Sequence, residues 1–401
     1  MRKVAVRSKT VWVVCIALVA GLSMLRLTTT THTKRAQNSS YSIPNPDPSQ
    51  ETQPYTQCTN FSAVEYATYP NYSSLTKPNN KFGLYIYAEE ERFFKLAQEL
   101  VNSNGGDWGY VLIPYNVKDR DSAKWRRVFK DLTAKHLIPI VQLWDVNITD
   151  YEGDTKEAAS FLNSFAWPVK ERYISAYNEP NDDRFWQGNA DPKNYARVLD
   201  YTITAFKQEN PNFFMLNGAL NATAPNGNGY IAALSFLDQM QREVPGIFSK
   251  LDGWASHSYP QPNFAGSPHA SGLWSIQAYK AELDYLATSL GLTKTLPVFI
   301  TETGWAHAEG ESYNSSFVTA QTAAQNIQIA YEQVWLQDDQ VRAVTPFTVV
   351  YNPPFDHFSW INSDGVPYEQ YELVKKLSKT KGEPASLQTS VLHISNCQTK
   401  P

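Results

Sequence analysis

The sequence predicts an α/β protein whose main domain is a (β/α)8 barrel of the TIM type. Between residues 81 and 380, short apolar or β-branched runs alternate with segments whose apolar residues recur every three or four positions. Eight such runs occur within about 300 residues, which matches the strand number and size of this barrel. No glycine-rich phosphate loop follows the first run, which disfavours the doubly wound open sheet as the alternative.

The eight expected strands are rich in Val, Ile, Tyr and Phe, the residue types that suit a buried sheet. In chain order they are 82–87, 110–115, 138–144, 173–177, 213–218, 253–259, 298–303 and 343–351. Between and after them, apolar residues with helical spacing indicate amphipathic helices. The clearest helical segments are 93–101, 195–206, 231–240 and 368–377. The first strand runs into Glu89 and Glu90, where two acids would repel a phosphate group.

Charge and composition exclude several classes of protein. The chain has 401 residues and a formal net charge of −4, so we expect no nucleic-acid partner. Its 42% of hydrophobic residues are too many for a mostly disordered chain. The 11 Trp and 23 Tyr are numerous enough to bind sugars or other half-apolar ligands as well as to fill a core.

Two carboxylates stand at the ends of predicted strands. Glu179 follows the fourth strand in Asn178-Glu179-Pro180, and Glu302 ends the seventh strand. In a closed eight-stranded barrel these two strand ends lie on opposite sides of one mouth, where the chemistry of such barrels occurs. A facing pair of carboxylates is the apparatus of glycoside hydrolysis. The pair is a far more specific indication of glycoside hydrolysis than either acid alone.

The segments 176–180 and 299–305 resemble the clan A glycoside hydrolases, a retaining (β/α)8 superfamily that includes families 5, 17 and 39. The resemblance covers 81–380 and is nearest to family 39 and to β-glucanase families. It implies that Glu179 is the general acid/base and Glu302 the nucleophile. The arginine and histidine that several of these families carry near strands two and three are not found here, so the resemblance leaves the subfamily open.

The resemblance also implies a set of substrate contacts. Asn178 would bind the sugar 2-hydroxyl, and Tyr259 would contact the nucleophile, with His257 beside it in a His-x-Tyr pattern. Trp360, after the eighth strand, would stack beneath the sugar.

Three further tryptophans near strand ends are candidates for sugar binding, or else for packing of loops. They are Trp144, Trp186 and Trp305.

We expect neither a metal nor a cofactor. The seven histidines are scattered, and no zinc, calcium or Gly-x-Ser-x-Gly motif is present.

The N-terminal residues 1–27 indicate export. Four basic residues precede the apolar run 11–25, and no acid occurs before Asp47. The run is shorter than the about 20 residues that span a bilayer. Two interpretations therefore remain open: a cleaved signal peptide, and membrane attachment of the protein through residues 10–27. Either interpretation predicts an extracytoplasmic protein.

Residues 28–57 are rich in Thr, Ser, Asn, Pro and Gln and are predicted to form a flexible stalk. The remaining residues, 58–401, would form the glycosidase domain around a barrel core at 81–380. Cys58 and Cys397 flank this domain, in a compartment where disulfides persist. A bridge between them is one alternative, and free thiols are the other.

The sequence thus predicts a monomeric, retaining glycosidase that cleaves β-linked poly- or oligosaccharides outside the cell, with endo cleavage favoured. Two alternatives use the same fold: a catalytically silent glycan-binding barrel and a transglycosylase.

Overall fold

A computed structural model describes residues 64–69 and 80–392 of the protein. The predicted export segment, the stalk and both flanking cysteines lie outside these residues. Within the described part, no helix is long and apolar enough to cross a membrane.

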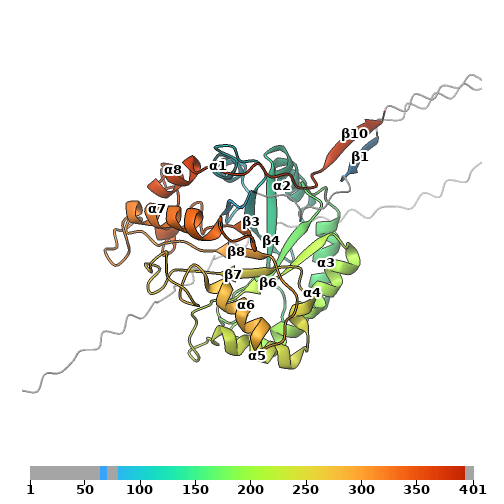
Figure 1. Cartoon of the computed structure of the whole chain (residues 1–401). Helices are drawn as coiled ribbons and strands as arrows, with labels where there is room; N and C mark the ends of the chain where they lie inside the picture. Colours follow the sequence, from blue (N-terminus) through green and yellow to red (C-terminus); the bar gives the residue numbers. More distant parts are fainter. Residues whose placement is uncertain (1–63, 70–79, 393–401) are drawn as a thin grey trace, which may run out of the picture. The chain divides into compact units, whose positions relative to one another are not determined.

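Eight parallel strands form the centre of the molecule (Figure 1). They are β2 Gly83–Tyr85, β3 Gly109–Asn116, β4 Leu137–Trp144, β5 Arg172–Asn178, β6 Phe213–Ala219, β7 Trp254–His257, β8 Val298–Glu302 and β9 Val341–Val344. Neighbours in sequence are neighbours in the sheets, in the order β2-β3-β4-β5-β6 and β7-β8-β9. Each strand overlaps one of the eight predicted from the sequence. The predicted eighth strand was too long, because β9 ends at Val344.

Short bridges join the two sheets into a ring. Leu216 of β6 bridges Gly253 in parallel, and Phe82 bridges Val344 of β9 in the same way. The amide of Val344 also donates a hydrogen bond of 2.9 Å to the carbonyl of Lys81. These contacts close the barrel between its last and first strands, and the predicted fold class is confirmed.

A glycine stands at each of these seams, where a side chain would have no room. A Cβ atom at Gly83 would lie 2.8 Å from the carbonyl oxygen of Val344, and one at Gly253 would lie 2.8 Å from the Leu216 side chain. Side chains at either place would push the neighbouring strands apart, so glycine permits the closure.

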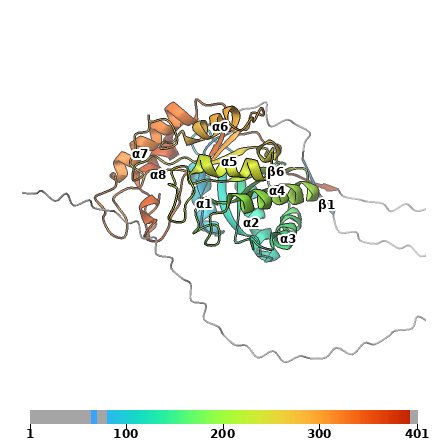
Figure 2. The ribbon, with the colours of Figure 1, turned by 90° about the horizontal axis from the view of Figure 1, so that it is seen from below.

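Helices surround the strands (Figure 1, Figure 2). They are α1 Glu91–Val101, α2 Ser122–Ala134, α3 Tyr151–Asn163, α4 Pro192–Glu209, α5 Ala233–Glu243, α6 Ala278–Thr288, α7 Ala320–Ile329 and α8 Glu369–Lys376. The short helices η2 Ile247–Lys250, η3 Ala330–Trp335 and η4 Asp356–Phe358 lie in the connections. Several starts are capped as expected: the side chain of Asp191 accepts hydrogen bonds from the amides of Lys193 and Asn194, and Pro192 opens α4.

Aromatic side chains fill the interior of the barrel. Tyr173 of β5 packs at 5.2 Å between ring centroids against Phe299 of β8, and Tyr110 of β3 meets both rings. A second and larger apolar cluster packs the outer faces of the strands against the helices. The barrel is therefore a solid core, and a site can form only over its C-terminal rim.

An antiparallel ribbon at the chain ends was not predicted from the sequence. Strand β1 (Val64–Thr68) pairs with β10 (Gln388–Leu392), and Val64 lies opposite Leu392. The ribbon lies apart from the eight barrel strands (Figure 1). It brings the beginning and the end of the described domain together.

Candidate active site

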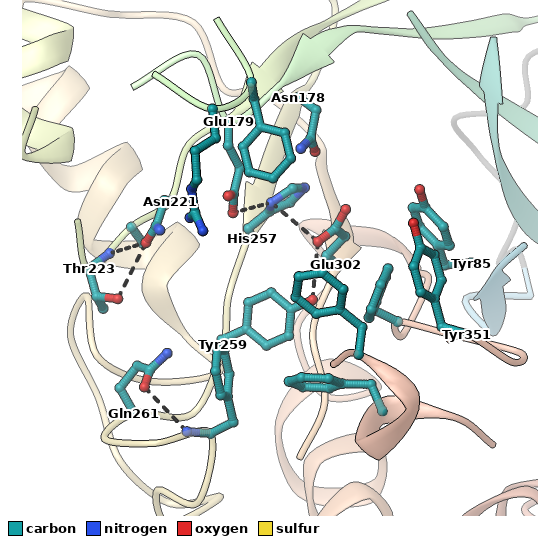
Figure 3. A pocket seen from close by; sticks show the side chains of 17 residues that line it. Tyr85, Asn178, Glu179, Asn221, Thr223, His257, Tyr259, Gln261, Glu302 and Tyr351 are labelled. Atoms are coloured by element: carbon teal, nitrogen blue, oxygen red, sulfur yellow. Dashed lines mark hydrogen bonds and ion pairs between the residues drawn. The ribbon is translucent and has the colours of Figure 1, made fainter. Parts of the chain in front are cut away.

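The two predicted acids meet at the C-terminal rim of the barrel. Glu302 is the last residue of β8, and Glu179 directly follows β5 with a left-handed φ of 36°. The amide of Glu179 is held by a 3.0 Å hydrogen bond to the carbonyl of Ala219 at the end of β6. Both carboxylates line one cavity of about 250 Å³, and Figure 3 shows them on either side of the His257 ring. Their side chains are only 13% and 12% exposed.

His257, at the end of β7, connects the two acids. Its Nδ1 lies 2.9 Å from Oε1 of Glu179 and 3.6 Å from Oε2 of Glu302. The ring is fully buried, and its Nε2 has no hydrogen-bond partner among the described residues. The pairing of β7 with β8 shifts its register between Ser256 and His257, and this shift places His257 opposite Glu302 at the rim.

Tyr259 contacts the proposed nucleophile, as the resemblance implied. Its hydroxyl donates a hydrogen bond of 3.1 Å to Oε2 of Glu302 (Figure 3). Burial of the hydroxyl and the neighbouring charge of Glu302 raise the pKa of Tyr259 well above its usual value, so the phenol keeps its proton and remains a donor.

Burial makes this cluster hold a proton near neutral pH. The pKa of the Glu302 carboxyl is raised to about 7, chiefly by removal from water and also by the charge of Glu179, while the charge of His257 opposes the rise. The hydrogen bond from Tyr259 lowers it. Burial of the His257 ring favours its neutral form, but the charge of Glu302 and the hydrogen bond with Glu179 outweigh this and raise the pKa of His257. Glu302 and His257 therefore titrate as interacting groups.

Asn178 lies beside Glu179 and also lines the cavity. Its side-chain oxygen accepts a hydrogen bond of 3.1 Å from Nε2 of Gln142, the side chain of a β4 residue. The hydrogen bond orients the amide and directs its NH2 group away from Gln142. Its proposed contact with a sugar hydroxyl stays a prediction.

Aromatic residues from the loop after β9 form the wall of the cavity opposite Glu179, and sequence reasoning missed them. Phe347 packs at 4.9 Å against Tyr85 and at 5.7 Å against Phe358. Tyr351 and Phe355 continue the same wall. Their position directly after a strand end could have identified them, but the predicted eighth strand ran to residue 351 and included two of them.

Trp360 does not form a platform at this cavity, and that prediction is wrong. It is 3% exposed and belongs to the apolar core. Its amide donates to the carbonyl of Thr348, so its chain segment folds back along the β9 loop. Trp305 is 4% exposed, its Nε1 donates a hydrogen bond to the carbonyl of Gly266, and it is not among the residues that line the cavity.

A second compartment of about 500 Å³ adjoins the first over the ends of β2 to β5. Trp144, 49% exposed, and Trp186, which is buried, both contribute to its lining. The residues that line both compartments are Tyr85, Asn178, Arg184, Phe185 and Tyr351. The two compartments therefore form one groove across the barrel mouth.

The same cluster has the composition of a metal site. One ligand atom each of Glu179, His257 and Glu302 lies within 4.8 Å of the others, and no other such group occurs among the described residues. The direct hydrogen bond between His257 and Glu179 suits acid–base chemistry without an ion.

No family model matches the sequence, and no curated protein matches it. Solved structures do match. A monomeric β-xylosidase from Caulobacter crescentus aligns over 78% of this chain and 70% of its own, with 15% identity and a TM-score of 0.50. A calcium-binding mutant of β-glucuronidase 2 from Bacteroides uniformis aligns over 78% of this chain and 36% of its own, with 11% identity and a TM-score of 0.50. At these identities the likeness shows the fold, the TIM barrel that these enzymes contain.

Proposed function

We propose that the protein is a retaining β-glycosidase that works by double displacement. The observation that carries the proposal is the pair Glu179 and Glu302, with oxygens within 4.8 Å of each other at the ends of β5 and β8. Retaining enzymes hold their carboxyl groups about 5 to 5.5 Å apart, whereas inverting enzymes need about 6.5 to 9.5 Å to admit a water. The short separation favours retention.

In the first step Glu302 attacks the anomeric carbon while Glu179 donates a proton to the leaving oxygen. In the second step Glu179 takes a proton from the water that releases the sugar from Glu302. Tyr259 and His257 both stabilise the anion of Glu302, the form that attacks the anomeric carbon. This reconciles a nucleophile whose pKa is about 7 with the need for an ionised carboxylate.

The groove favours a sugar chain as the substrate. The groove continues into one compartment on each side of the five residues that the compartments share. Aromatic rings line the groove, and such rings suit the apolar faces of sugars. The likeness to a β-xylosidase barrel agrees with a β-linked substrate. We therefore propose cleavage within β-linked poly- or oligosaccharides, by a monomer. The basic and apolar N-terminus supports a location outside the cytoplasm, which cell fractionation tests.

The variant Glu302→Gly tests the assignment of Glu302 as the nucleophile. The variant should lose turnover, because no other side chain can form the glycosyl-enzyme, and added azide should restore activity and give an α-glycosyl azide from a β-linked substrate. Full activity of Glu302→Gly would contradict the assignment. Binding without cleavage by the parent protein would favour the silent barrel, and sugar-to-sugar transfer as the main reaction would favour the transglycosylase. Loss of parent activity on dialysis against a chelator would favour a metal at Glu179, His257 and Glu302.

A further inference from the structure

Arg184 lies where the two compartments of the groove meet, and the proposed double displacement does not use it. It lies on the loop that follows Glu179 and lines both compartments. Among the described residues that line the groove, it is the only lysine or arginine. Glu179, Glu302 and Asp145 are the acids in the same lining, and Asp145 is paired with Lys118 outside it.

The guanidinium of Arg184 is held in place by Asp182, whose side chain is fully buried. Nε of Arg184 lies 2.9 and 3.0 Å from the two carboxylate oxygens, and Nη2 bonds one of them as well. The amide of Asp182 in turn donates a 2.9 Å hydrogen bond to the carbonyl of Glu179. Arg184 is therefore fixed relative to the proposed acid/base.

One edge of the guanidinium remains available. Nη1 makes no hydrogen bond to any described residue, and the side chain is 36% exposed in the groove. Phe185 and Tyr230 lie at 5.5 and 5.4 Å from its central carbon, so the planar group is flanked by rings as well as bonded. An arginine held along one edge presents its remaining N–H groups in a fixed geometry.

The charge of this arginine is already balanced. The bidentate pair with Asp182 cancels it, and a positive charge on His257 would lie against Glu179 and Glu302, so the junction has no net positive charge. A carboxylate or sulfate on the substrate would meet no uncompensated cation there and would be repelled by the ionised Glu302. A sugar hydroxyl, in contrast, needs only a donor.

We infer that Arg184 is a substrate-binding residue of the proposed glycosidase. Its free edge donates hydrogen bonds to hydroxyl groups of a neutral sugar at the junction, and Asp182 positions the guanidinium and excludes acidic sugars. The inference rests on the proposed function and narrows its substrates to neutral β-glycans.

The first test is a panel of β-linked oligosaccharides, with gluco-, xylo- and laminari-oligomers against oligouronides of equal length, each measured for cleavage and for binding by titration. The parent protein should prefer a neutral member by tenfold or more. A preference for the uronides would overturn the inference. Binding without cleavage would contradict the proposed function, but the binding preference would still test the role of Arg184. No binding of any oligosaccharide would contradict both the proposed function and the role of Arg184.

The second test uses Arg184→Gln and Arg184→Lys on the preferred neutral oligosaccharide. Both should raise KM or Kd by about tenfold or more with a smaller effect on kcat, because a charge-assisted hydrogen bond to the bound sugar is lost. Lysine can still form an ion pair with Asp182, so a loss of affinity in Arg184→Lys reports the lost contact with the sugar and not a loss of folding. Arg242→Gln, on the exposed side of α5, should behave as the parent. An unchanged KM in both Arg184 variants would refute the role.

Asp182→Asn tests the charge balance. The substitution removes the negative charge that compensates Arg184 and keeps the shape of the side chain. The affinity for oligouronides relative to that for neutral oligosaccharides should therefore rise. This ratio is internal to one preparation and does not depend on the folded fraction. A ratio equal to that of the parent would contradict the excluding role of Asp182.

Discussion

At the scale of single residues, the central feature is a carboxylate that burial makes reluctant to ionise. Glu302 is almost enclosed, and its pKa is raised to about 7 by that burial, yet the proposed reaction needs it as an anion. The apolar pocket disfavours the anion of Glu302, and Tyr259 and His257 stabilise that anion. Perturbed carboxyls of this kind gather at functional sites.

Tyr259→Phe should shift the acidic limb of the pH profile of kcat/KM to higher pH. The hydrogen bond from Tyr259 favours the ionised form of Glu302, and its loss raises the pKa of that carboxyl. Initial rates between pH 4 and 9 measure the shift. Tyr313→Phe, on a ring that is 70% exposed, is the matched control. A limb that stays in place or moves to lower pH would contradict this role.

Glu302→Gln should be more stable than the parent protein at pH 8 by about 2 to 3 kcal/mol, and equally stable near pH 4. The folded state holds the proton of Glu302 up to about pH 7, whereas the unfolded chain releases it near the ordinary value of 4.5. Stability from this group is therefore complete at low pH and is lost as the pH rises through 7. Denaturant unfolding at both pH values checks it, with Glu372→Gln on α8 as the control. A variant less stable than the parent at pH 8 would refute the argument.

At the scale of elements, alternating apolar runs and helical spacing were enough to find all eight barrel strands. The ends of β5 and β8 were placed within one residue, so Glu179 and Glu302 could be found from their order alone. The end of β9 could not be placed, because apolar residues continue into the loop where Phe347 and Tyr351 line the groove. The β1 and β10 ribbon depends on pairing between distant segments, which carries no local pattern.

The β9 loop supplies a direct comparison of two aromatic residues. Phe347→Ala should raise KM for oligosaccharides several-fold and cost less stability than Trp360→Ala, since Phe347 lines the groove and is only partly buried against the core. Trp360→Ala should lower the free energy of unfolding by about 3 to 5 kcal/mol, since Trp360 is buried in the core. Kinetics and thermal unfolding of both variants are the measurements. The reverse pattern would restore Trp360 as the sugar platform.

At the scale of the whole molecule, the ribbon joins the two ends of the barrel domain. Cys58 precedes Val64 of β1 by six residues, and Cys397 follows Leu392 of β10 by five. Both cysteines lie outside the described residues, and their pairing stays a prediction. Because β1 and β10 pair, a disulfide between the flanking segments would close the domain at the same place.

Protein exported to an oxidising compartment should contain the Cys58 to Cys397 bridge. It would close a loop of about 340 residues and add about 4 to 5 kcal/mol at most in the chain-entropy model. Peptide mapping without reductant should find the two cysteine peptides joined, and reduction should separate them and lower Tm. Two peptides that each carry an alkylatable thiol would contradict the bridge.

The central claim is that Glu302 forms a covalent bond with the substrate, which trapping tests most directly. Incubation with a 2-deoxy-2-fluoro-β-glycosyl fluoride of the preferred neutral sugar slows both steps by destabilising their oxocarbenium-like transition states, and the good fluoride leaving group lets the intermediate accumulate. Intact-mass and peptide mass spectrometry should show one fluoroglycosyl group per chain, attached to Glu302. Cleavage of the natural substrate with no trapped adduct and an inverted product, or an adduct on another residue, would contradict the account.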